Sequence, residues 1–170
     1  MSDLRSSTVP PLGEHDHLRG DAHAPLVIFY GDFSCPFCAV AHSQLKTLRL
    51  RLAFRHFALA SRPRALALAC AVEAAGRQEA FWELHDALLE DQAHTEDPHL
   101  WAHATRLGLD LERFQEDRRS EEVLGRVRAD LPGALRAAVA QTPTLFVDGV
   151  AHPGPPSPGL LETLSQRAVR

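Results

Sequence analysis

The chain has 170 residues, enough for one domain with a substantial core, and its composition is that of an ordinary globular protein. A net charge of −4 gives no reason to expect nucleic-acid binding, and no apolar run approaches the ~20 residues that span a bilayer. Three cysteines are too few for a secreted scaffold held together by disulfides.

The N-terminal residues, 1–20, are expected to form a flexible arm, because polar residues near a terminus are usually solvated. Within this arm, His15-Asp16-His17 offers metal-ligand side chains, which we also expect to be solvated. The arm lacks the apolar core that a secretory signal carries, so the sequence predicts a cytoplasmic protein. The apolar residues 25–30 then predict a first, buried strand.

The motif Cys35-Pro36-Phe37-Cys38 follows this strand and opens a stretch with helical periodicity that runs to about Leu50. Free N–H groups and the helix dipole at a helix N-terminus favour a thiolate at Cys35, and the thiolate is the nucleophile. Pro36 is tolerated there, because first-turn N–H groups have no acceptor within the helix. Cys38 lies one turn further on, where it can resolve a mixed disulfide on Cys35. The motif therefore predicts a dithiol–disulfide site.

The rest of the chain alternates between strand and helix signals. Residues 51–57 predict a second strand, and residues 63–138 show helical patterns with no strand pattern among them. Cys70 lies in an apolar helical stretch of this segment and is expected to be a packing residue. Asp148-Gly149 is a strong hairpin signal between short strands at 144–147 and 150–152, and a closing helix is predicted over 160–169.

Five motifs in this order resemble the DsbA-like group of thioredoxin-fold proteins, over a stretch from about residue 18 to the C-terminus. They are GDFSCPFC (31–38), RHF (55–57), FWELHD (81–86), LGLD (107–110) and TPTLFVDG (142–149). The resemblance implies an α/β thioredoxin fold with an all-helical insertion between the second and third strands. One compact domain is then expected, with its core in residues 21–62 and 139–170 and its insert in residues 63–138.

The resemblance also implies a thiol–disulfide oxidoreductase in which Cys35 attacks and Cys38 resolves. No cofactor is needed, since the dithiol is itself the redox centre. The expected partners are protein or low-molecular-weight thiol and disulfide substrates, together with a partner reductase or a thiol pool. No nucleic acid or membrane is expected among them.

Substrate-binding residues follow from the same resemblance. A cis bond between Thr142 and Pro143 is implied opposite the CxxC motif, where the backbone of Thr142 pairs with an extended substrate segment. Pro36 lies in the motif itself, and Phe33 and Phe37 are expected to form an apolar rim that accepts the peptide.

The sequence departs from the family at one position. Six residues before the first cysteine, where the family commonly carries a buried acid that accepts the proton of the resolving thiol, this chain has Phe29. A missing proton acceptor should raise the pKa of Cys38 and slow its attack. His56, near the end of the second predicted strand, is a candidate for relaying this proton instead.

Two alternatives remain open. The first is a structural zinc site, for which Cys35 and Cys38 would supply two thiolates and His42, four residues after Cys38, a further ligand. Structural zinc usually takes four ligands from two paired motifs, and the sequence offers one pair, so no metal is expected. The other is a redox-sensing or partner-binding module on the same fold, in which Cys35 and Cys38 do not turn over. Catalytic reduction of insulin would distinguish an enzyme from such a module, whereas the direction of the reaction depends on the reduction potential of the pair.

Overall fold

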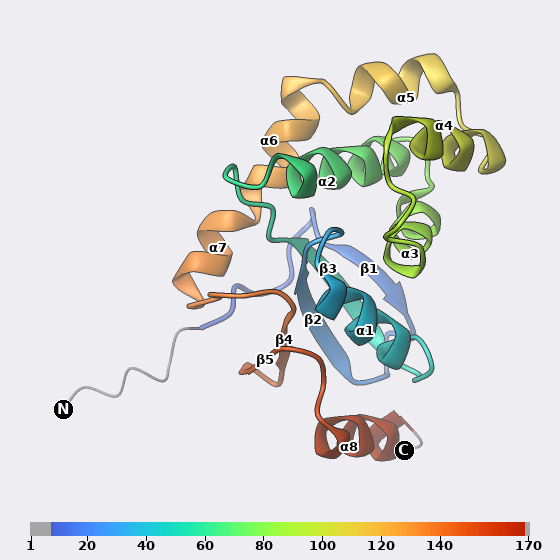
Figure 1. The fold of residues 1–170 in the computed structure, drawn as a ribbon. Helices are drawn as coiled ribbons and strands as arrows, with labels where there is room; N and C mark the ends of the chain where they lie inside the picture. The colour runs from blue at the N-terminus through green and yellow to red at the C-terminus, as the bar shows by residue number, and fades with distance from the viewer. Residues whose placement is uncertain (1–7, 169–170) are drawn as a thin grey trace.

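The protein is described by a computed structural model that covers residues 8–168 and is built around a five-stranded sheet (Figure 1). The spatial order of the strands is β1-β3-β2-β4-β5. The central pair β2 and β3 is parallel, and the other neighbouring strands are antiparallel. The strands are β1 (His17–Gly20), β2 (Leu26–Gly31), β3 (Arg51–His56), β4 (Thr144–Val147) and β5 (Val150–Pro153).

Helix α1 (Pro36–Leu45) makes the crossover between β2 and β3, as a parallel pair requires. It begins at the CxxC motif, as predicted, but ends before the expected Leu50. The Lys46 N–H caps the last turn on the His42 carbonyl, and the chain then turns back into β3.

The expectation of a flexible arm over residues 1–20 is wrong for its last part. Residues His17 to Gly20 form β1, which pairs with β3 and covers the edge of that strand. The segment before it is also held, because the Arg55 guanidinium binds the Asp16 carboxylate with its closest oxygen at 2.7 Å. Burial of both side chains in this ion pair explains why a polar segment is ordered and not solvated. Residues 1–7 of the predicted arm lie outside the described residues.

The helical insertion lies between β3 and β4, which are the second and third strands of the prediction. Figure 1 shows helices α2 to α6 gathered at one end of the sheet, with α1 crossing one face. Helix α8 (Pro158–Ala168) closes the chain. No helix among residues 8–168 combines the length and apolar content needed to cross a membrane. The helices of the insertion are α2 (Pro63–Gly76), α3 (Phe81–Glu90), α4 (Asp97–Arg106), α5 (Leu111–Asp117), α6 (Glu121–Ala129) and α7 (Leu131–Arg136).

The sheet separates two apolar cores, and β2 contributes to both. Val27 and Phe29 point into the larger core, which also contains Cys38 and the buried faces of α2 and α3. Ile28 and Tyr30 alternate onto the other face, where they pack with residues of α7. This burial on both faces explains why β2 reads as a continuous apolar run.

Cys70 lies on α2 with an exposed fraction of 5%, which confirms its expected place among packing residues. Burial raises the pKa of its thiol to about 11, so it is a poor nucleophile near neutral pH.

Candidate redox site

The loop between β2 and α1 places Cys35 at the start of the helix. Strand β2 ends at Gly31, where a Cβ atom would lie 2.6 Å from the Phe54 ring, so only glycine fits without a shift of that side chain. Asp32 then closes the turn, because its Oδ1 accepts hydrogen bonds from the N–H and the hydroxyl of Ser34, both at 2.7 Å. Cys35 follows as the N-cap residue of α1, in an extended conformation.

Cys35 is buried, with 8% of its surface exposed. Its Sγ–H donates to the Thr142 carbonyl oxygen at 3.3 Å. The pKa of Cys35 is lowered to about 5, because hydrogen bonds from the Cys38 and Thr142 side chains and from the N–H groups of Phe37 and Cys38 outweigh the effect of burial. A thiolate at Cys35 is therefore favoured at neutral pH.

Cys38 lies beneath it with no exposed surface. The Asp32 N–H donates to its Sγ at 3.5 Å. Burial and the neighbouring Cys35 raise the pKa of Cys38 far above that of an ordinary thiol. The pKa of Cys35 is therefore lowered and that of Cys38 raised, which is the difference expected between a nucleophilic thiolate and a protonated resolving thiol.

The loop before β4 faces this dithiol. The peptide bond between Thr142 and Pro143 is cis, as predicted from the resemblance. A cavity of about 560 Å³ opens beside the two segments. Phe37 stands at its edge with 61% of its surface exposed, in agreement with a rim position. The cavity is lined by Cys35, Pro36, Phe37, Phe57, Leu59, Arg62, Ala140, Gln141, Thr142, Gly154 and Pro155.

A family comparison agrees with this geometry. Residues 13–164 match the family model described as Thioredoxin. The chain belongs to the thioredoxin family. Its CxxC motif, the cis-proline loop and the strand order between them are therefore those of a thioredoxin fold.

Solved structures that share this fold include DsbA proteins and other thioredoxin-like proteins. BdbD from Bacillus subtilis superimposes with a TM-score of 0.79 at 21% identity, over 96% of this chain and 98% of that chain. A thioredoxin-like oxidoreductase from Silicibacter pomeroyi gives a TM-score of 0.77 at 22% identity, over 92% and 94%. The alpha-DsbA1 protein from Wolbachia pipientis gives 0.74 at 20% identity, over 94% of each chain. These similarities confirm the predicted thioredoxin fold with its helical insertion.

Curated relatives of higher identity are much longer proteins. A protein named Na(+)/H(+) antiporter NhaA 1 from Salinispora arenicola is 41% identical over 153 residues, which are 86% of this chain and 24% of the relative. Na(+)/H(+) antiporter NhaA 3 from Salinispora tropica is 40% identical over 154 residues, with the same coverage of 86% and 24%. The chain therefore spans about a quarter of the length of the curated relatives it matches.

In this thioredoxin-fold protein, Phe33 is not a rim residue, and that prediction is wrong. Its exposed fraction is 1%, and its ring packs against Phe54 with centroids 5.2 Å apart. The turn that Asp32 closes directs this side chain into the larger core. The aromatic surface of the cavity comes from Phe37 and Phe57 instead.

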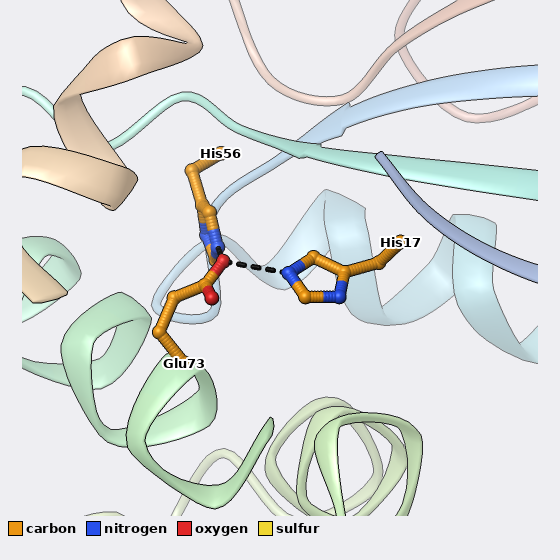
Figure 2. A group of neighbouring side chains, drawn as sticks. All are labelled: His17, His56 and Glu73. Carbon is orange, nitrogen blue, oxygen red and sulfur yellow. Dashed lines mark hydrogen bonds and ion pairs between the residues drawn. The ribbon is translucent and has the colours of Figure 1, made fainter. Parts of the chain in front are cut away.

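His56 is engaged by a carboxylate. Its Nε2 lies 2.7 Å from Oε1 of Glu73, and the Nε2 of His17 lies 2.8 Å from the same oxygen (Figure 2). Burial raises the pKa of Glu73, but hydrogen bonds from His17 and His56 outweigh it and hold this pKa well below its usual range. No hydrogen bond joins His56 to Cys38 within residues 8–168, so the proton relay stays a prediction.

Among residues 8–168, two groups of side chains could supply ligands for a metal ion: His17, His56 and Glu73, and His42, His85 and Asp86. In both groups an arginine lies beside the carboxylate. Arg126 is 3.8 Å from Glu73, and Arg19 binds Asp86 through both carboxylate oxygens. Hydrogen bonds and these cations already satisfy the carboxylates. In the described part of the chain, no such group unites His42 with the two cysteines, which is what the zinc alternative requires.

Sequence reasoning missed that three polar side chains, those of Asp32, Arg62 and Gln92, support the segment 32–35 between β2 and α1, which we call the redox loop. Arg62, just before α2, donates to the buried Asp32 carboxylate at 2.9 Å. Gln92, between α3 and α4, donates to two carbonyls of the loop. Asp32 belongs to a motif that the sequence singled out, whereas Arg62 and Gln92 carry no local signal, since their partners are 30 or more residues away.

Proposed function

We propose that the chain is a thiol–disulfide oxidoreductase that acts on protein or small thiol substrates through Cys35 and Cys38. The observation that carries this proposal is the contrast between the two thiols. The pKa of Cys35 is lowered to about 5, while Cys38, one helical turn away, is buried and protonated.

The chemistry proceeds by two exchanges. The Cys35 thiolate attacks one sulfur of a substrate disulfide, and the other substrate sulfur leaves as a thiolate that takes up a proton. Cys38 then loses its proton and attacks the Cys35 sulfur, which releases the second substrate thiol. The substrate disulfide is reduced, and Cys35 and Cys38 are joined in a disulfide. A partner reductase or a thiol pool returns the pair to the dithiol, and the same steps in reverse donate a disulfide.

The cavity supports an extended, partly apolar substrate segment. Phe37 and Pro36 offer an apolar surface beside the reactive sulfur, and the Thr142 backbone lies within hydrogen-bond distance of it. A substrate strand that pairs with the Thr142 backbone would bring its cysteine against Cys35. The cytoplasmic location expected from residues 1–20 stays a prediction.

A second candidate is a redox-sensing or partner-binding module that does not turn over. The lengths of the curated relatives support this second candidate, because the segment that matches this chain makes up about a quarter of proteins named as antiporters. In such a setting, oxidation of Cys35 and Cys38 would change a contact with another part of the protein.

Insulin reduction coupled to a thiol reductant tests the two candidates. We expect turnover by the wild-type protein and by Cys70→Ala, and loss of turnover in Cys35→Ser. In Cys38→Ser, mixed disulfides should accumulate on Cys35, because the resolving thiol is absent. A wild-type protein that forms the Cys35–Cys38 disulfide but reduces insulin no faster than the reductant alone would contradict the enzyme and favour the module.

A further inference from the structure

Gln92 ties the helical insertion to the redox loop. It lies between α3 and α4, far in sequence from the loop that joins β2 to α1. Its side-chain Nε2 donates to the Phe33 carbonyl at 2.8 Å and to the Cys35 carbonyl at 2.9 Å. One half-buried amide thus holds two peptide groups of the loop, Phe33–Ser34 and Cys35–Pro36.

These carbonyls matter because of the charge that develops next to them. A carbonyl oxygen carries partial negative charge and opposes a thiolate on the same residue, while N–H groups at the helix start favour it. The Cys35 carbonyl accepts the first hydrogen bonds of α1, from the N–H groups of Cys38 at 3.0 Å and Ala39 at 3.4 Å. A third donor on this oxygen offsets its charge and fixes the orientation of its peptide group. The N–H groups of Phe37 and Cys38 that face the Cys35 sulfur depend on the same orientation.

We propose that Gln92 is a positioning residue of the redox site, whose amide holds the Phe33 and Cys35 carbonyls so that the first N–H groups of α1 stay directed at the Cys35 sulfur. The inference rests on the proposed function, since it concerns the same dithiol. It assigns to the insertion a direct part in setting the reactivity of the nucleophile.

The test is the pH dependence of Cys35 alkylation by iodoacetamide in the reduced protein, with the modified residue located by mass spectrometry. Gln92→Ala removes both hydrogen bonds. We expect its alkylation at pH 5 to be slower than in wild type by about twofold to fivefold, which corresponds to a rise of about half to one unit in a Cys35 pKa of about 5. Gln92→Glu keeps the shape of the side chain, but an ionised carboxylate cannot donate and adds negative charge, so a larger shift is expected.

Gln78 provides a matched control. It also bridges two segments, with its Nε2 donating to the Asp110 carbonyl at 3.2 Å and its Oε1 accepting from the Asp110 N–H at 2.9 Å, but it does not touch the redox loop. Gln78→Ala should lower the melting temperature without moving the alkylation profile.

Alkylation profiles of Gln92→Ala and Gln92→Glu that coincide with wild type, while melting temperatures fall as in Gln78→Ala, would overturn the inference and leave Gln92 a structural tie. Should Gln92→Ala not fold, Gln92→Asn serves in its place, because its shorter side chain cannot span both carbonyls. Alkylation needs no substrate, so a shifted profile supports the inference even if insulin is not reduced. If the wild-type protein reduces insulin but the Gln92 variants have the same alkylation profile as wild type, the inference about Gln92 is wrong and the proposed function stands.

Discussion

At the scale of residues, two cysteines of the same motif acquire opposite properties. Cys35 meets N–H groups and polar side chains at the helix start, whereas Cys38 is enclosed by apolar side chains of the larger core. Burial penalises a charged thiolate, and hydrogen bonds to it offset that penalty only at Cys35. The proposed division into a nucleophile and a resolving thiol therefore follows from a difference in surroundings over one turn of helix.

Phe29 occupies the position at which the resemblance implies a buried proton acceptor, so a substitution there tests that role. It is fully buried in the same core as Cys38, and its ring packs on Phe54. Phe29→Glu should lower stability by about 3–5 kcal/mol, because it removes a packed ring and buries a carboxyl group. We expect it nevertheless to speed release from a Cys35-linked mixed disulfide, most visibly above pH 7, where more of the raised-pKa carboxyl is ionised.

Single-turnover release between pH 6 and 9, beside a melting curve, measures both effects. Phe29→Gln is the matched control, because the Gln side chain has nearly the same shape as Glu but carries no ionisable group. Equal release rates in the two variants at every pH would contradict the proton-acceptor argument.

At the scale of elements, β2 and α1 are joined by a turn that leaves no room for a side chain at its first residue. Gly31 lies against the rings of Phe29 and Phe54. The geometry of the dithiol thus depends on packing behind it as well as on the motif itself, because a shift of these rings would move the start of α1.

Gly31→Ala should destabilise the protein by about 1–3 kcal/mol through overpacking against the Phe54 ring. Gly125→Ala is the control. Gly125 is exposed on α6, and a Cβ there would meet no atom within 4 Å, so this change should stabilise by up to about 1 kcal/mol. Urea unfolding measures both, and a Gly31→Ala protein as stable as wild type would show that the rings yield without cost.

At the scale of the whole molecule, the Glu73 carboxylate joins three parts of the fold. It lies on α2 in the insertion, His17 on β1 and His56 on β3 (Figure 2). One carboxylate therefore links the edge strand, the centre of the sheet and the insertion. Loss of these hydrogen bonds should lower the stability of the whole domain.

Glu73→Gln should lower stability at neutral pH by about 1–3 kcal/mol. Because the folded pKa of Glu73 lies below its ordinary value of 4.5, the stabilisation is complete above pH 4.5 and is lost as the pH falls further. The difference in melting temperature between wild type and Glu73→Gln should then shrink in acid. Glu83→Gln, on an exposed position of α3, should show no difference at either pH. A constant gap for Glu73→Gln from pH 7 to pH 3 would contradict the argument.

The sequence alone determined the redox motif, a strand on either side of the motif and its helix, the helical insertion and the hairpin near the C-terminus. These follow from local signals: an apolar run at 25–30, the helix start at Cys35 and Pro36, helical periodicity over 63–138, and Asp148-Gly149. The place of Thr142-Pro143 opposite the cysteines followed from resemblance and was confirmed.

Only the tertiary structure decided which side chains meet. Strand β1 is four residues long, with intermediate and exposed positions alternating along it, so it carries little pattern of its own and is ordered by pairing with β3. Phe33 lies in the core and not at the rim, because the turn closed by Asp32 sets its direction. The contacts of Gln92 span more than fifty residues of sequence. Local periodicity indicates which face of an element is buried, whereas contacts between residues far apart in sequence form only when the chain has folded.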